Sequence, residues 1–189
     1  MSHRNLEKFI FIHINKTGGT SITMALNLPN KHKTALEIID KIGRRNWNNI
    51  FTFTVVRNPW DKVVSHYHYR VQTNQTSLGE NPISFKEWVQ RTYGEQDSLY
   101  YDKPKMFMPQ VNWISDKSGN IIVNRIMHFE NIDEEFTELS KILNINKDVA
   151  LPHVKSSKRG HYRDYYDENS IQIVQNWFMR DIEEFGYKF

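Results

Sequence analysis

The chain has 189 residues, of which 39% are hydrophobic and 13% aromatic, and this is enough for one globular domain with a full core. The formal net charge of +3 suits a small polyanionic ligand but is too low to indicate a nucleic-acid partner. Because the sequence contains no cysteine, it excludes a disulfide framework and a zinc–thiolate site. The polar N-terminus and the lack of a long apolar stretch predict a cytoplasmic protein without a membrane anchor. We expect a single domain over residues 1–189, and the sequence is silent on its oligomeric state.

The first motif is an apolar run from Phe9, which predicts a buried strand, followed by a polar loop and a helix. The loop carries a lysine, two glycines and three hydroxyl groups. Glycines let backbone N–H groups approach a ligand, a helix N-terminus favours negative charge, and the lysine adds a full positive charge. The loop therefore predicts an anion site, although a plain turn with solvated polar residues is the alternative. The candidate ligands are Lys16, Thr17, Gly18, Gly19, Thr20 and Ser21.

This loop differs from the P-loop of ATP- and GTP-binding enzymes. That motif requires G-x-x-x-x-G-K-[ST], with glycines leading to the lysine. Here the glycines follow Lys16, and Thr17 is only a loose counterpart of the residue that holds magnesium. We therefore expect a phosphate-binding loop that does not belong to a standard nucleoside triphosphatase.

A second strand, turn and helix begin at Phe51. The turn is at Asn58-Pro59, and proline suits the first helical turn because its missing N–H is not needed there. Arg57 lies at the end of the strand, and Ser65 follows about two helical turns along the helix. An arginine fork and a serine hydroxyl can hold a second anion.

The two motifs together resemble those of the sulfotransferases that use 3′-phosphoadenosine 5′-phosphosulfate (PAPS). In that family the first loop holds the 5′-phosphosulfate, while the strand-end arginine and the helix serine hold the 3′-phosphate. The resemblance therefore assigns the first role to Lys16–Ser21 and the second to Arg57 and Ser65. Later segments resemble the carbohydrate-type branch: His128–Ile132, Leu151–His153, Tyr162–Tyr166 and Phe185–Phe189.

The catalytic base of this family often lies between the two cofactor motifs. In this region His32 and Glu37 offer that chemistry. A histidine can take a proton near neutral pH, so we expect His32 to be the base, against the alternative of an exposed loop histidine. Thr34 and Glu37 have the spacing of a helix capping box, which favours a structural role for Glu37.

A basic segment with few apolar residues runs from Pro152 to Arg163. The family often places a basic, glycine-containing segment over the nucleotide. The resemblance thus implies that Lys158, Arg159 and Gly160 lie near the 3′-phosphate, while a solvated linker is the alternative.

The alternation of strands and helices predicts an α/β fold with a central, mainly parallel sheet in three layers. The resemblance to the family implies a P-loop-like version of this fold, with the ligand loops at the carboxyl ends of the strands. We also expect a hairpin or a pair of short strands over Trp113–Ser115 and Ile121–Phe129, and a final helix from Glu168 to Phe185.

The resemblance implies a PAPS-dependent sulfotransferase that acts on an acceptor hydroxyl of a glycan or a small hydroxylated metabolite. Lys16 would stabilise the leaving group and His32 would remove the acceptor proton. We expect no metal, since Lys16 and the helix dipole replace it, and since His66 and His68 point in different directions on a helix. Two alternatives stay open: a nucleotide or nucleoside kinase of P-loop type, and a catalytically inactive PAPS-binding domain.

Overall fold

The computed structural model describes residues 9–145, 151–152 and 159–189. The chain divides into two compact units. The sheet unit comprises Met1–Val56 and Val111–Val154, and the helical unit comprises Arg57–Gln110 and Lys155–Phe189. The expectation of a single domain over the whole chain stays a prediction.

The sheet unit is built on three parallel strands in the order β1-β2-β3. Phe9 of β1 pairs with Phe51 of β2, and Phe53 of β2 pairs with Arg125 of β3. The predicted strands at Phe9 and Phe51 are confirmed, as is the parallel sheet. The strand bounds are β1 Phe9–Ile12, β2 Phe51–Val56 and β3 Arg125–His128.

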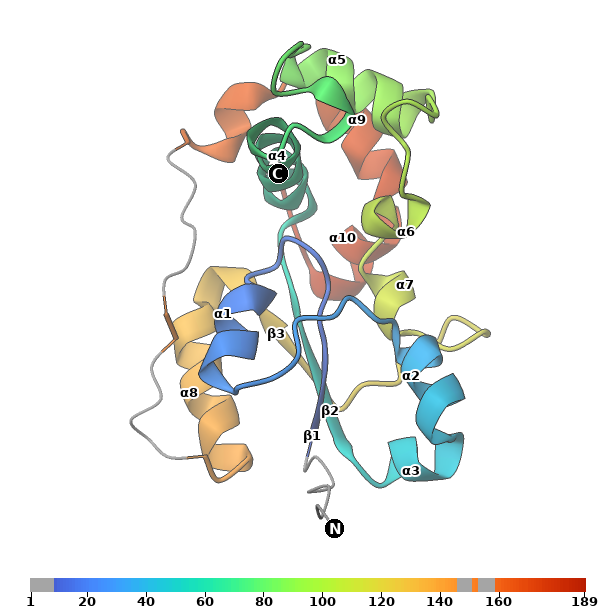
Figure 1. Cartoon of the computed structure of the whole chain (residues 1–189), viewed down its shortest axis with the longest axis vertical. Helices are drawn as coiled ribbons and strands as arrows, with labels where there is room; N and C mark the ends of the chain where they lie inside the picture. Colours follow the sequence, from blue (N-terminus) through green and yellow to red (C-terminus); the bar gives the residue numbers. More distant parts are fainter. Residues whose placement is uncertain (1–8, 146–150, 153–158) are drawn as a thin grey trace. The chain divides into compact units, whose positions relative to one another are not determined.

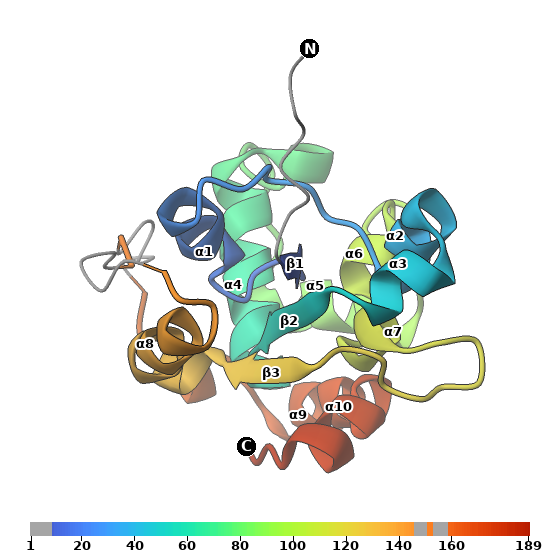
Figure 2. The same cartoon turned by 90° about the horizontal axis from the view of Figure 1, so that it is seen from below.

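Helices flank the sheet on both faces within this unit. Helices α1 and α8 cover one face, and α2, α3 and α7 cover the other (Figures 1 and 2). On the first face the buried core joins Ile22 of α1, Phe53 and Val55 of β2, and Phe136 and Leu139 of α8. The expected α/β fold, with a parallel sheet between helices, is therefore confirmed. The helix bounds are α1 Gly19–Ala25, α2 Ala35–Ile42, α3 Arg44–Asn48, α7 Val111–Ile114, η3 Phe129–Asn131 and α8 Ile132–Ile142.

The capping box predicted before α2 is present. The backbone N–H of Thr34 donates to the Glu37 carboxylate at 2.7 Å, and the backbone N–H of Glu37 donates to the Thr34 hydroxyl at 3.2 Å. These bonds satisfy backbone donors that a helix start leaves without intrahelical partners. The helix ends at Gly43, whose φ of 84° few other residues adopt at low cost.

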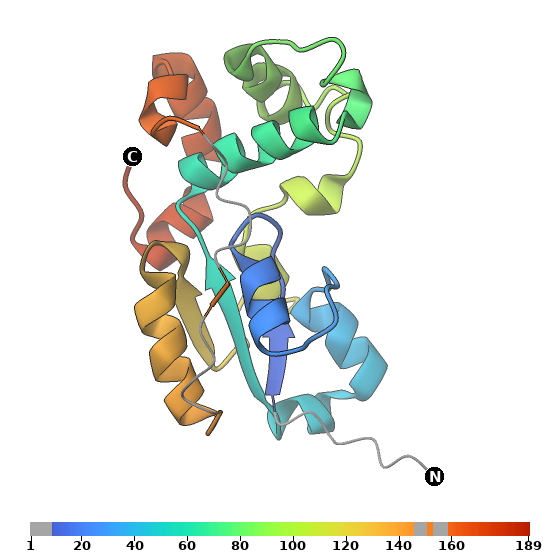
Figure 3. The same cartoon turned by 60° about the vertical axis from the view of Figure 1, so that its left-hand side comes forward.

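The helical unit is organised around α4, with α9 packed against it (Figure 3). Asn58 caps α4 by accepting from the backbone N–H of Trp60 at 3.1 Å, and Pro59 occupies the first helical position as predicted. The elements of this unit are α4 Pro59–Gln72, η1 Gln75–Ser77, α5 Phe85–Val89, η2 Gln90–Gly94, α6 Pro104–Phe107, η4 Tyr162–Tyr165, α9 Glu168–Trp177 and α10 Met179–Phe185.

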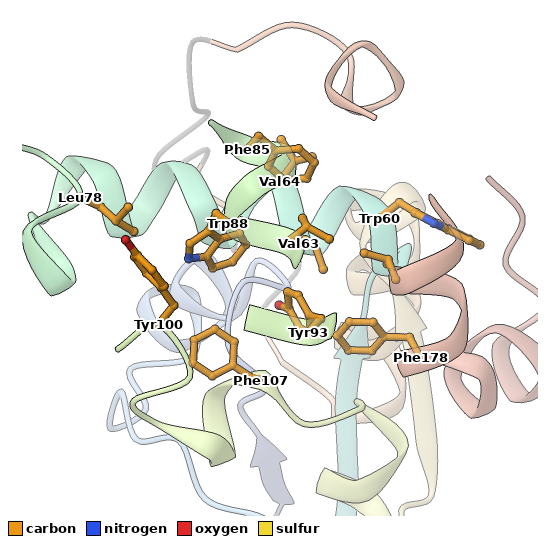
Figure 4. Packing of buried hydrophobic residues seen from close by; sticks show 12 residues of the cluster. Trp60, Val63, Val64, Leu78, Phe85, Trp88, Tyr93, Tyr100, Phe107 and Phe178 are labelled. Carbon is orange, nitrogen blue, oxygen red and sulfur yellow. The ribbon is translucent and has the colours of Figure 1, made fainter. Parts of the chain in front are cut away.

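Aromatic side chains form the core of the helical unit (Figure 4). Trp88 and Phe107 are fully buried, and Tyr93 stands edge-on to both rings, with centroids 5.7 Å and 5.9 Å away. Such edge-to-face pairs add to the free energy gained by burying apolar area. This core gives α4 a rigid support.

Two expectations on secondary structure are confirmed only in part. The expected strand over Ile121–Phe129 contains β3. Trp113–Ser115 was expected to be extended, but Val111–Ile114 forms the short helix α7, and a single bridge joins Ser115 to Ile121. A short apolar run has no distinct period, so its pattern does not separate a strand from a buried helical turn. The final helix is interrupted at Phe178, which ends α9 and precedes α10.

None of the helices in the described part of the chain combines the length and the apolar character needed to cross a bilayer.

Candidate functional site

The first candidate loop joins β1 to α1 through left-handed backbone. Lys16 has a φ of 64° and Gly18 a φ of 80°. The lysine conformation is uncommon for a residue other than glycine, and strained residues of this kind cluster at ligand sites. Lys16, Gly18, Thr20 and Ser21 are all partly exposed.

Thr17 is fully buried, and its side chain stabilises the loop by a hydrogen bond. Its hydroxyl donates to the carbonyl oxygen of Ile14 at 3.0 Å. The backbone N–H of Ser21 donates to the carbonyl of Gly18 at 3.0 Å, which tightens the first turn of α1. Thus the Thr17 hydroxyl proton is used in a hydrogen bond within the loop. The hydroxyl-bearing residues of the loop that are partly exposed are Thr20 and Ser21.

Gly19 is needed because the ring of His13 lies directly against it. A Cβ atom at Gly19 would come within 2.1 Å of His13 Cδ2 and 2.3 Å of its Nε2. Real Cβ atoms essentially never approach so closely, so one of the two residues would have to move. Gly19 therefore lets the loop pass over His13, a buried histidine that no sequence motif indicated.

His13 and His32 form a pair within the sheet unit. Nδ1 of His32 lies 2.9 Å from the carbonyl oxygen of His13, and the two rings lie 4.3 Å apart. A carbonyl oxygen only accepts, so Nδ1 of His32 carries a proton and neutral His32 presents its lone pair on Nε2. Burial and repulsion from His32 lower the pKa of His13 to about 3, against a hydrogen bond with Asn30 that raises it, so His13 stays neutral.

The position of His32 differs from that of an exposed loop histidine. The residue is half-buried, and its ring stands edge-on to Trp113 with centroids 6.3 Å apart. Glu37, the other possible base, is used in the capping box. Of these two residues, His32 is therefore the better placed for proton transfer.

The second candidate site, in the helical unit, gathers two arginines around one carboxylate. Arg57 donates to Asp61 Oδ2 from Nε at 2.8 Å and from Nη2 at 2.6 Å, and Arg159 donates to Asp61 Oδ1 from Nη2. Both arginine side chains are almost completely buried. Two buried guanidiniums and one carboxylate leave an excess of positive charge, which favours an anion.

Asp61 was not among the residues singled out from the sequence, although its spacing of four from Arg57 is a recognisable signal for an ion pair. Burial would raise the pKa of Asp61, but attraction to Arg57 and Arg159 and their hydrogen bonds hold it below its usual value. Asp61 is therefore ionised at neutral pH and orients both arginines.

Ser65 lies one helical turn beyond Asp61 on the same face of α4 and is half-buried. His68 follows it by three residues, and its pKa is lowered by burial and by the charge of Arg159. Arg159 therefore contacts α4 at Asp61 and acts electrostatically on His68, and these two residues lie on either side of Ser65 in the chain. Of the other two expected residues, Gly160 follows Arg159 and is exposed, while Lys158 lies outside the described residues.

Across residues 9–145, 151–152 and 159–189, no three histidine, aspartate or glutamate side chains come together as a metal ion would require.

Comparison with known proteins gives three findings. The pattern described as the Sulfotransferase family matches residues 2–188. An uncharacterized protein of Archaeoglobus fulgidus is 25% identical over 126 residues, which make up 67% of this chain and 93% of that protein. The crystal structure of mouse sulfotransferase SULT7A1 complexed with PAP is 12% identical, with a TM-score of 0.49, and the match covers 92% of this chain and 83% of that chain.

Proposed function

Because this chain belongs to the sulfotransferase family, we propose that it transfers a sulfonate group from PAPS to an acceptor hydroxyl. The observation that carries the proposal is the meeting of Arg57 and Arg159 at Asp61, beside the face of α4 that holds Ser65. Two guanidiniums suit a phosphate dianion, and a 3′-phosphate is the group that distinguishes PAPS from ATP. When bound, PAPS supplies an activated sulfonate whose leaving group is adenosine 3′,5′-bisphosphate.

We assign the 3′-phosphate to Arg57, Ser65 and Arg159, with Gly160 and Lys158 as further ligands. Arg57 and Arg159 contribute charge-assisted hydrogen bonds, and Ser65 contributes a hydroxyl donor. Asp61 keeps the arginines together before the ligand arrives, so less order has to be gained on binding.

We assign the 5′-phosphosulfate to the loop Lys16–Ser21. Backbone N–H groups at Gly18 and Gly19 and the partly exposed hydroxyls of Thr20 and Ser21 suit its oxygens, while Thr17 stabilises the loop from within. Lys16 places its charge where negative charge grows on the departing oxygen, which is the electrostatic role that it shares with lysines in phosphoryl transfer. This scheme involves no metal ion.

His32 is the proposed catalytic base. Its Nδ1–H is held by the His13 carbonyl, so Nε2 has the lone pair that accepts the proton of the acceptor hydroxyl. The acceptor oxygen then forms a bond to sulfur while the bond from sulfur to the bisphosphate oxygen breaks. The acceptor class that we favour is a glycan or a small hydroxylated metabolite. A cytoplasmic location and the absence of a nucleic-acid partner stay predictions.

The test is incubation with PAPS and a panel of hydroxylated acceptors, followed by mass spectrometry for sulfonated products. In parallel, adenosine 3′,5′-bisphosphate should raise the melting temperature more than ATP with magnesium, because ATP has no phosphate for Arg57. Equal stabilisation by the two ligands would instead favour a kinase. Stabilisation by the bisphosphate without product from any acceptor would favour an inactive PAPS-binding domain.

A further inference from the structure

A buried polar chain runs from the backbone of Arg57 into the core of the helical unit. The backbone N–H of Arg57 donates to Gln110 Oε1 at 2.9 Å, and Gln110 Nε2 donates back to the carbonyl of Arg57 at 2.8 Å. Asp181 Oδ2 accepts from the backbone N–H of Gln110 at 2.7 Å and from its Nε2 at 3.2 Å. Gln110 and Asp181 are both fully buried.

The chemistry of Gln110 matches this position. The backbone of Arg57 offers one donor and one acceptor, so its partner must accept and donate at once. A side-chain amide does so without charge, whereas a glutamate could not donate and would place a second carboxylate against Asp181. The amide therefore fixes both polar groups of the Arg57 peptide.

Lys62 is a second buried charged group, and it attracts the Asp181 carboxylate. Lys62 is buried like Asp181, and its ammonium lies 5.4 Å from the centroid of the Phe178 ring. Burial lowers the pKa of Lys62 to about 8, against attraction from Asp181 and with added repulsion from Arg57. Attraction to Asp181 thus opposes the effect of burial on Lys62, and a buried carboxylate that attracts a cation is less costly than one alone.

We propose that Gln110 is a positioning residue for Arg57, and that Asp181 holds Gln110 in place for this task. The inference rests on the proposed function, since it gives Arg57 the 3′-phosphate as its ligand. The guanidinium is oriented by Asp61, and Gln110 fixes the peptide from which that side chain projects. Position matters here because a small displacement of a charged group weakens a bidentate contact strongly.

The experiment measures the 3′-phosphate preference, which is the Kd of adenosine 5′-phosphate divided by the Kd of adenosine 3′,5′-bisphosphate, by titration calorimetry. Gln110→Met keeps the length of the side chain and removes its two hydrogen bonds to the Arg57 backbone, together with the one from Nε2 to Asp181. It should lower this preference about tenfold, mainly by weakening the binding of the bisphosphate. Thr92→Val, which removes a fully buried hydroxyl elsewhere in the helical unit, is the matched control and should leave the preference unchanged.

Arg57→Ala separates this inference from the proposed function. If the unaltered protein shows no preference, or if Arg57→Ala leaves it unchanged, the assignment of Arg57 to the 3′-phosphate is wrong. If Arg57→Ala lowers the preference while Arg159 and Ser65 keep part of it, adding Gln110→Met to that variant should lower it no further. A further loss in the double variant, or no loss in Gln110→Met alone, would overturn the positioning role.

Asp181→Asn provides the same test should Gln110→Met fail to fold. Asparagine keeps an oxygen that can accept from Gln110 and removes the negative charge, so the preference should fall by a smaller factor of about three. A preference equal to that of Thr92→Val would count against the proposal.

Discussion

The Asp61 carboxylate is held by the guanidinium of Arg57, with Oδ2 lying 2.8 Å from Nε and 2.6 Å from Nη2. Arg57 precedes α4 and Asp61 lies in its first turn, four residues on, so the contact forms within a single local stretch. A carboxylate in this place resembles the anion that the arginine is proposed to bind. It orients the buried guanidinium of Arg57.

The first prediction is that Asp61 stabilises the fold at neutral pH and not in acid. Because its pKa is held below the unfolded value of about 3.9, the unfolded chain binds more protons as pH falls through that range. The stabilisation is therefore complete above that value and is lost as pH falls through the lower, folded pKa. Asp61→Asn should cost about 1–3 kcal/mol at pH 7.

Urea unfolding of both proteins at pH 7 and in steps below pH 4 measures this difference. The gap between the two unfolding free energies should close as the pH falls. A gap that stayed constant down to pH 3 would mean that the carboxylate charge is not what stabilises this site.

The second prediction concerns Lys62 and Asp181, two buried groups of opposite charge that attract each other. Lys62→Met removes one positive charge that attracts this buried carboxylate and should destabilise the protein by roughly 3–5 kcal/mol. Lys62→Met combined with Asp181→Asn removes both charges and should recover most of that loss. The exposed pair of Lys86 and Asp167, 3.3 Å apart, is the control, and Lys86→Met should cost less than about 1 kcal/mol. If the double variant were as unstable as Lys62→Met, the unpaired charge would not be the cause.

The third prediction concerns the proposed base. His32→Gln should reduce turnover about 10²–10⁴-fold while leaving the affinity for adenosine 3′,5′-bisphosphate almost unchanged. Glu37→Gln, which preserves the capping box, should leave turnover unchanged. Steady-state kinetics and calorimetry distinguish the two effects. Full activity in His32→Gln would move the base to another residue.

The fourth prediction follows from the contact between Gly19 and His13. Gly19→Ala should destabilise the protein by about 1–3 kcal/mol and should reduce turnover, because the displaced residue also carries the carbonyl that orients His32. Gly94→Ala is the matched control, since its Cβ would meet only the flexible end of Gln90, 3.2 Å away. Melting temperatures and turnover of both variants test this, and similar behaviour of the two would contradict it.

Local signals predicted much of the fold correctly. The capping box at Thr34 and the proline after Asn58 depend on neighbours in the sequence, and both are confirmed. The parallel sheet also followed from the alternation of strands and helices. The helical spacing of the apolar residues around Phe178 predicts one continuous helix, from Glu168 to Phe185. The break at Phe178 accompanies its burial against Tyr93, with ring centroids 5.7 Å apart, a contact distant in the chain.

In the candidate site, too, residues that belong to a local motif could be predicted, and residues that the fold brings together could not. Arg57 and Ser65 belong to one motif and could be singled out from the sequence, whereas their supports could not. Gln110 lies 53 residues beyond Arg57, and Asp181 a further 71 residues on, with no repeating spacing to connect them. A side chain that acts by holding another residue leaves little trace in a sequence pattern, because the fold brings the pair together.

The fifth prediction concerns the left-handed backbone at Lys16, where selection for thermal stability and selection for turnover should favour different residues. A residue other than glycine or asparagine in this conformation costs about 1 kcal/mol, so Lys16→Asn should raise the melting temperature while it abolishes turnover. A variant library sorted for heat resistance should therefore lose lysine at this position, and one sorted for product formation should retain it. Sequencing both pools and comparing the frequency of lysine at position 16 would show whether this residue lowers thermal stability while it is required for activity.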